Sequence, residues 1–189
     1  MIRTTIGDII DGKLDYPEDI PEDYIVYIVR DDKIIFYIGK SESSVLDRLF
    51  SHFGRGSFGW AGYSFLNQFV KNNLPESRDW QIELYTGEEC ILVLENITNY
   101  KRYTDSDGTS CLMLREIAYP DGTRLIQRIK VSNVKGLERE LIRALKPCLN
   151  TKDNPNPTSL PEKYQIVQNN TVWEKVEKLI GLDDDLDVP

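Results

Sequence analysis

The chain has very few of the side chains that bind metals through nitrogen and sulfur. Its 189 residues include one histidine, His52, and three widely spaced cysteines, Cys90, Cys111 and Cys148. A single histidine excludes zinc sites built from several histidines. Three scattered cysteines argue against a disulfide framework or a cysteine-ligated zinc site. We therefore expect the three cysteines to be reduced and buried.

Long apolar segments are also missing. No apolar run approaches the roughly 20 residues needed to cross a bilayer. The first ten residues, MIRTTIGDII, lack the basic and apolar blocks of a signal peptide. No glycine-lysine phosphate loop of the nucleotide-binding type occurs either. We expect a cytoplasmic protein without a membrane partner.

An excess of basic residues is absent too, because the formal net charge is -8. This charge argues against nonspecific attachment to nucleic acid, which depends on clustered lysine and arginine. The distribution is uneven, since residues 101–150 contain ten basic and six acidic side chains. That segment is compatible both with a groove for a polyanion and with an ordinary solvated surface.

Residues 24–40, YIVYIVRDDKIIFYIGK, contain two short apolar runs that each carry a tyrosine. The pattern predicts a β-hairpin with strands at 24–30 and 34–38. A three-residue loop would pair Tyr27 with Tyr37 on one face, whereas a two-residue loop would pair Tyr27 with Phe36. Both registers remain open.

Helical and strand patterns alternate through the rest of the chain. Ser44 and Asp47 have the spacing of a capping box and predict a helix that continues to Phe53. Further elements are predicted as a helix at 65–70, a strand at 80–84, a helix at 87–95, a second hairpin around 119–122, a helix at 134–145 and a C-terminal helix at 171–180. The sequence thus predicts a single α+β domain over residues 1–189.

Three polar residues lie where a structural and a functional interpretation compete. On the helix at 134–145, Glu138 falls within the apolar arc, whereas Glu140 projects to the other side. A carboxylate on an apolar face is costly unless it is paired, protonated or metal-bound. Glu138 is therefore either a local ion-pair partner or a metal ligand or acid-base group. Arg48 and His52, four residues apart on one flank of their helix, leave the same choice open.

Taken in order, these residues resemble the motifs of the GIY-YIG nuclease superfamily. The first motif stands as Ile25-Val26-Tyr27, with isoleucine in place of the family's glycine, and the second is intact as Tyr37-Ile38-Gly39. The family's helix arginine matches Arg48, and the position one turn later matches His52. The spacing of the family's glutamate region matches Glu138, Ile142, Pro147 and Asn150. The resemblance covers residues 24–85 and 132–151, which makes 86–131 an insertion and 152–189 a C-terminal extension.

The resemblance implies a small three-stranded antiparallel sheet flanked by helices, with an inserted β-hairpin and a C-terminal helix. It implies a divalent-metal-dependent endonuclease that hydrolyses DNA phosphodiester bonds, of the restriction or the repair and recombination type. Glu138 would hold one Mg²⁺ or Mn²⁺ ion, Arg48 would clamp the phosphate, and a neighbouring cation would lower the pKa of Tyr27. The implied catalytic residues are Tyr27, Tyr37, Arg48, His52 and Glu138, supported by Gly39, Lys40 and Asn150.

The small core leaves sequence preference to the insertion. There, Arg115, Arg124, Arg128 and Lys130 are candidates for contacts to DNA. Trp173 on the C-terminal helix is a candidate homodimer interface. Two alternatives remain: a catalytically inactive domain of this fold that binds nucleic acid or a protein, and a purely structural domain whose tyrosines are ordinary strand aromatics.

Overall fold

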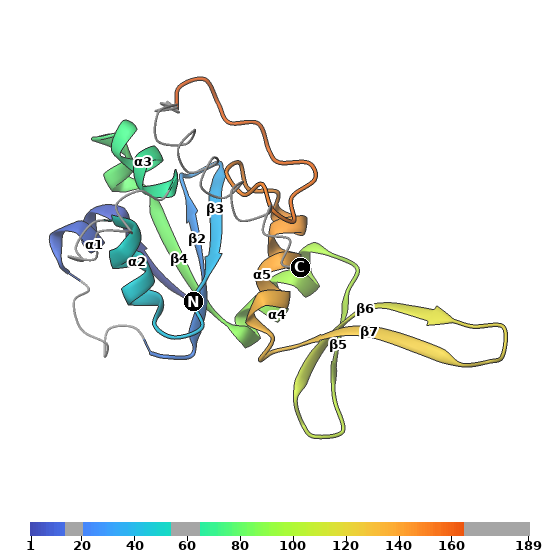
Figure 1. Cartoon of the computed structure of the whole chain (residues 1–189). Coiled ribbons are helices and arrows are strands. Elements are labelled where there is room, and N and C mark those ends of the chain that lie inside the picture. Colours follow the sequence, from blue (N-terminus) through green and yellow to red (C-terminus); the bar gives the residue numbers. More distant parts are fainter. Residues whose placement is uncertain (14–20, 54–64, 165–189) are drawn as a thin grey trace, which may run out of the picture.

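The chain folds as an α+β domain with two antiparallel sheets (Figure 1). The computed structural model describes residues 1–13, 21–53 and 65–164. The larger sheet has the order β1-β4-β2-β3, formed by β1 (Ile2–Thr5), β4 (Gln81–Thr86), β2 (Tyr24–Arg30) and β3 (Ile35–Lys40). The smaller sheet has the order β5-β6-β7, formed by β5 (Lys101–Thr104), β6 (Ser110–Ala118) and β7 (Arg124–Lys130).

Helices cover both faces of the larger sheet (Figure 1). One face carries α1 (Ile6–Asp11), α2 (Val45–Phe53) and α3 (Phe65–Asn72), and the other carries α4 (Gly87–Ile97) and α5 (Val134–Leu145). A 3-10 helix, η3 (Glu76–Asp79), precedes β4. Successive residues of a strand point to opposite faces, so Tyr27 and Val29 join the first core while Val26 and Ile28 join the second. Burial on both faces explains why this strand is almost continuously apolar.

Most elements expected from periodicity are present. The first hairpin, the helices at 45–53 and 65–70, the third strand, the second hairpin and the helix at 134–145 are confirmed. Ser44 Oγ accepts a hydrogen bond from the Asp47 amide at 3.1 Å, as expected of a cap. The turn of the second hairpin is closed by a bond from the Tyr119 amide to the Thr123 carbonyl at 2.8 Å.

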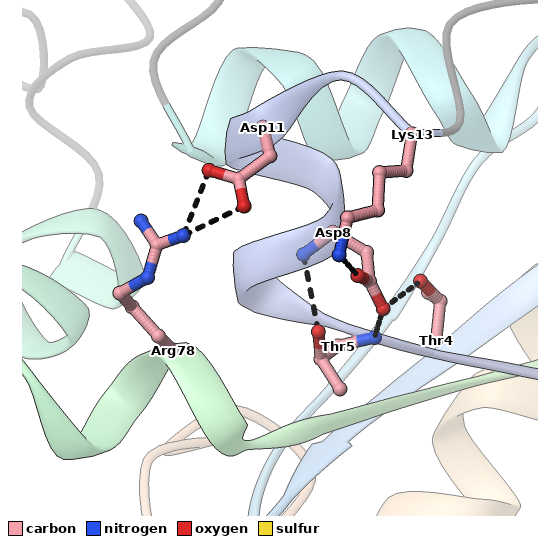
Figure 2. A network of polar contacts seen from close by, with 6 residues as sticks. All are labelled: Thr4, Thr5, Asp8, Asp11, Lys13 and Arg78. Carbon is pink, nitrogen blue, oxygen red and sulfur yellow. Dashed lines mark hydrogen bonds and ion pairs between the residues drawn. The ribbon is translucent and has the colours of Figure 1, made fainter.

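The expected three-stranded sheet is too small, because the N-terminal residues add a fourth strand. In β1, Ile2 pairs with Leu84 and Thr4 with Ile82. Thr5 then caps α1 in a reciprocal box, in which the Asp8 amide donates to Thr5 Oγ1 at 3.1 Å and the Thr5 amide to Asp8 Oδ2 at 3.2 Å (Figure 2). A strand of four residues is too short for its periodicity to be recognised in the sequence.

An ion pair fixes α1 against the segment that leads into β4. Figure 2 shows the Arg78 guanidinium of η3 reaching the Asp11 carboxylate, with Nη2 at 2.7 and 2.8 Å from its two oxygens. The Ile6 amide also donates to the Trp80 carbonyl at 3.0 Å. The first 13 residues are thus an integral part of the sheet layer.

Helix α4 belongs to the core although its residues fall within the expected insertion. Its Cys90, Ile91 and Leu94 are fully buried in the second core, against Leu137 and Leu141 of α5. The smaller sheet extends away from the body of the domain (Figure 1). The predicted helix at 171–180, Trp173 and the loop at 54–64 lie outside the described residues. Within the described ranges, no helix combines the length and apolarity needed to cross a bilayer.

The open edge of β3 is covered by the chain that follows α5. The Cys148 and Leu149 amides donate to the Ile35 and Phe36 carbonyls at 3.0 and 2.9 Å. Asn150 continues this contact with its side chain, because its Oδ1 accepts from the Ile38 amide at 2.9 Å and its Nδ2 donates to the Ile38 carbonyl at 2.8 Å. Asn150 therefore holds the main chain between Tyr37 and Gly39 as a further strand would.

We predict that Asn150→Ala lowers the free energy of unfolding by about 2 to 4 kcal/mol, because it leaves one donor and one acceptor of Ile38 buried without partners. Urea denaturation followed by circular dichroism measures the change. Asn99→Ala, at an exposed position, is the matched control and is expected to change stability by less than about 0.5 kcal/mol. Equal stability of the two variants would contradict the bracing role of Asn150.

Candidate active site

The two tyrosines of the first hairpin share a face in a register that neither predicted loop length gives. Tyr27 pairs with Gly39 and Val29 with Tyr37, while Arg30 pairs with Ile35. The pairing skips Phe36, so the bulge places both Phe36 and Tyr37 against the first core. The predicted pairings of Tyr27 with Tyr37 or Phe36 are therefore wrong, because the loop is followed by an unpaired residue.

Glycine at position 39 allows the two phenols to lie together. A Cβ atom there would come within 2.3 Å of Tyr27 Cζ and Oη and within 2.8 Å of Tyr37 Cε1. Real Cβ atoms do not approach other atoms so closely. The Tyr27 ring thus lies across the bare backbone of β3, with its centroid 6.1 Å from that of Tyr37. The glycine is required by close approach and not by an unusual backbone angle.

Helix α2 brings His52 to the same place. Tyr27 Oη and His52 Nε2 lie 2.8 Å apart in a buried hydrogen bond. The histidine ring centroid is 5.9 Å from that of Tyr27 and 6.2 Å from that of Tyr37. Asn67 of α3 fixes this end of α2 by donating from Nδ2 to the His52 carbonyl. Three aromatic rings from two strands and a helix therefore form one cluster.

Burial keeps this cluster uncharged. Desolvation raises the pKa of Tyr27 far above its usual range, and the neighbouring Tyr37 raises it further, although the charge of Arg48 opposes both. Desolvation also raises the pKa of Tyr37. The same burial, with Arg48 nearby, lowers the pKa of His52 to about 4. Arg48 lowers the pKa of Tyr27, as expected of a neighbouring cation, but burial outweighs this effect and the pKa is raised overall.

A pocket of about 380 Å³ opens beside this cluster. Its walls come from β2, β3, the start of α2 and α5, and it is lined by Tyr27, Tyr37, Lys40, Ser41, Glu42, Arg48 and Glu138. Four of the five expected catalytic side chains thus line one pocket, and the fifth, His52, is bonded to Tyr27. The elements that supply them are up to about a hundred residues apart in the sequence.

Glu138 of α5 lines this pocket. It is half-buried, and no residue within the described ranges gives it a hydrogen bond or an ion pair. Desolvation raises its pKa, while the charge of Lys40 acts in the opposite direction. The structure therefore removes the interpretation of Glu138 as one half of a local ion pair within the described part of the chain.

Glu140 does not point to solvent as the helical wheel predicted. It is only 3% exposed, because the segment that precedes β5 covers this flank of α5. Tyr100 Oη donates to Glu140 Oε2 at 2.9 Å, and the guanidinium of Arg143 lies 2.9 Å from Oε1. The helix has two buried flanks, of which the sequence pattern showed one. Of the two acids, Glu140 has hydrogen-bond and ion-pair partners, whereas Glu138 has none among the residues that the structure describes.

Two lining residues were not anticipated. Ser41 Oγ donates to the Ser44 carbonyl at 2.8 Å and so shapes the turn into α2. Glu42 is exposed and forms an ion pair with Lys40. Both directly follow the Gly39-Lys40 pair, and this position beside a motif was the one available signal in the sequence.

The basic residues of the insertion lie apart from the pocket and are mostly engaged. Arg124 pairs with Glu116 at 2.9 Å, Arg128 with Asp105 at 3.2 Å, and Lys130 with Asp107 at 2.9 Å. Arg115 is exposed, and no described residue forms an ion pair with it. The four candidates for DNA contacts therefore fall into an engaged set of three and one unpaired side chain.

The donor set at the pocket suits a hard cation. In the described part of the chain, no three histidine, cysteine, aspartate or glutamate side chains gather as a metal site. Magnesium typically takes one or two carboxylates and completes its shell with phosphate oxygens and waters. Glu138, unpaired and facing the pocket, fits that pattern, whereas a zinc site would need more protein ligands.

Comparisons with known proteins found no match. No family model matches the chain, and neither a curated protein nor a solved structure is similar to it. The functional interpretation therefore depends on the geometry of the pocket and on the sequence motifs.

The single histidine gives a direct test of the buried cluster. We predict that His52 titrates near pH 4 in the folded protein. Because the chain has one histidine, proton NMR of its ring can follow this titration directly. Unfolded histidine has a pKa of about 6.5, so the unfolded chain binds more protons between these values and stability falls as the pH drops from 6.5 to 4. The loss attributable to His52 is about 3 kcal/mol at pH 4.

Urea denaturation at a series of pH values measures this loss. His52→Gln is the control, because it removes the titrating group and is expected to flatten the stability profile over this window. Identical pH slopes in the wild type and in His52→Gln would show that His52 is not held neutral by burial.

Proposed function

We propose that the protein is a divalent-metal-dependent endonuclease that hydrolyses DNA phosphodiester bonds at this pocket. The observation that carries the proposal is the convergence of Tyr27, Tyr37, Arg48 and Glu138 around one opening, with His52 bonded to Tyr27. The resemblance of the sequence motifs to the GIY-YIG nucleases supports the same reaction. A cluster of ordinary strand aromatics would have no need of an unpaired carboxylate and an arginine beside it.

The Tyr27–His52 contact supplies a route for a proton. A neutral phenol is a poor base, and burial keeps Tyr27 neutral. Burial lowers the pKa of His52 to about 4, so its ring is neutral at neutral pH, and in the tautomer protonated at Nδ1 its Nε2 accepts the hydrogen bond from Tyr27 Oη. In the proposed step, the attacking water gives its proton to Tyr27 Oη while Tyr27 passes its own proton to His52 Nε2. No phenolate is then required before the attack.

The cationic residues of the pocket suit a phosphate. Arg48 presents a planar guanidinium with several donors, which matches two phosphate oxygens at once as a lysine cannot. Lys40 also lines the pocket and forms an ion pair with Glu42. Positive groups placed where negative charge develops lower the barrier to phosphoryl transfer. Tyr37 completes the wall and orients the water or the phosphate.

Glu138 would hold one Mg²⁺ or Mn²⁺ ion. When bound, such an ion supplies positive charge that stabilises the leaving oxygen and the pentacovalent phosphorus. Glu138 has to be ionised for this role, and burial raises its pKa. The cation and the nearby Lys40 both favour the ionised carboxylate.

A supercoiled-plasmid nicking assay tests the proposal. We predict that Glu138→Gln lowers metal-dependent nicking at least 100-fold, because the neutral amide is a poor ligand for a hard cation. The fold is expected to persist, since Glu138 has no described hydrogen-bond or ion-pair partner to lose. Glu76→Gln, at an exposed position of η3, is the matched control and retains nicking.

Two outcomes would overturn the assignment. Equal activity of Glu138→Gln and Glu76→Gln would show that this pocket is not the site of cleavage. Plasmid binding without nicking by the wild type, with Mg²⁺ and with Mn²⁺, would favour the inactive binding domain of the same fold.

A further inference from the structure

The hairpin β6–β7 has a fixed base and an exposed outer half. At its base, Leu112 and Ile129 pair with each other and are buried in the second core. The Val131 amide donates to the Ser110 carbonyl at 3.0 Å and closes the base of the hairpin. From the pair Arg115 and Gln127 outward, the hairpin extends away from the body of the domain (Figure 1). It is thus a supported ribbon and not a loose loop.

The two faces of this outer half differ in chemistry. Arg115 pairs with Gln127 and Ile117 with Leu125, so these four side chains share one face, called here the Arg115 face. On the opposite face, Arg124 is already neutralised by Glu116. Only the Arg115 face presents polar side chains that have no partner among the described residues.

Arg115 and Gln127 carry the side-chain groups that distinguish bases. Both are exposed, and neither forms a side-chain hydrogen bond or an ion pair with a residue the structure describes. Arginine forms two bonds to the O6 and N7 atoms of guanine, and glutamine forms two bonds to the N6 and N7 atoms of adenine. Directly paired residues have Cβ atoms about 5 Å apart, so these two side chains can contact neighbouring base pairs.

The dimensions and charge suit the major groove of duplex DNA. That groove is about 12 Å wide and 8.5 Å deep and admits a two-stranded β-ribbon. Residues 101–130, which include the acidic partners of Arg128 and Lys130, carry six basic and four acidic side chains, although the whole chain has a net charge of -8. Ile117 and Leu125 add apolar surface that can contact a thymine methyl group.

We propose that the outer half of the β6–β7 hairpin enters the major groove of duplex DNA and that Arg115 and Gln127 recognise a guanine and an adenine on neighbouring base pairs. This rests on the proposed function and adds its substrate class, a duplex with a preferred sequence. Arg124, Arg128 and Lys130, tied to acidic partners, do not contribute to base recognition.

The connection to the pocket supports the pairing of recognition and cleavage. Only three residues separate β7 from α5, the helix that carries Glu138. The hydrogen bond from Lys40 and its charge lower the pKa of Glu42 at the pocket wall, and Lys135, in the first turn of α5, lies near enough to add to this effect. Gly87 of α4 packs against this connection, since a Cβ there would come within 2.5 Å of the Val131 carbonyl oxygen. The ribbon and the helix are therefore joined by a short, packed link.

Selection from a pool of random duplexes tests the proposal. The full chain carrying Glu138→Gln is used so that bound DNA is not cut, and bound duplexes are recovered and sequenced. A motif that contains a guanine next to an adenine is expected. Adding Arg115→Ala is expected to reduce discrimination at the guanine by roughly 10- to 100-fold, and adding Gln127→Ala should do the same at the adenine. Arg124→Ala, on the opposite face, is the matched control and leaves the motif unchanged.

The outcomes separate this inference from the proposed function. A motif that persists in both Arg115→Ala and Gln127→Ala, or no motif at all, overturns the inference. Nicking by the wild type without sequence preference would refute base recognition but remain consistent with the proposed nuclease. A motif that depends on Arg115, without nicking by the wild type, would refute the proposed nuclease but support base recognition by the hairpin. If Leu125→Asp instead converts a dimer into a monomer in light scattering while the motif persists, the Arg115 face binds a second copy.

Discussion

The contact between Tyr27 and the backbone at Gly39 is the constraint from which the rest of the candidate site follows. The ring occupies the space that a side chain at position 39 would fill, and this closeness aims the phenol oxygen at His52. The bulge at Phe36 supplies the second condition, because it turns Tyr37 onto the same face. Asn150 holds the strand in place from its open edge. A shift of one residue in this pairing would move the phenols to opposite faces.

Burial then decides which groups at the site carry charge. Tyr27 and His52 are buried and neutral, which suits a pair that exchanges a proton more than a pair that attracts an ion. The charged groups, Arg48, Lys40 and Glu138, lie at the pocket walls instead. This division keeps the proposed proton route away from solvent and would place fixed charges beside the proposed anionic substrate and its cation. All of these groups come from the strand pair β2–β3 and the helices α2 and α5.

Local sequence patterns predicted many of the helices and strands. The features that they did not predict depend on contacts between residues far apart in the sequence. The helix at 45–53 and the second hairpin have strong caps or turns, and both were predicted. No sequence pattern indicates the bulge at Phe36, so the predicted register of the first hairpin was wrong. Strand β1 is too short to show a period, and the burial of Glu140 depends on Tyr100, forty residues away. The position of Glu138 was foreseen because its neighbours on the helix are apolar.

The net charge of -8 bears on how the proposed nuclease would bind DNA. Long-range attraction to phosphates is weak in an acidic protein, so binding has to come from a few well-placed groups. The ion pairs of Arg124, Arg128 and Lys130 fit this, because a cation paired with an acid attracts the phosphates of any duplex less strongly. What remains is the Arg115 face, whose proposed contacts are to base edges and would depend on the base sequence. In the proposed nuclease, Arg115 and Gln127, which have no side-chain partner in the described part of the chain, would favour discrimination between sequences over general affinity, and the short link to α5 would join this ribbon to the helix that carries Glu138.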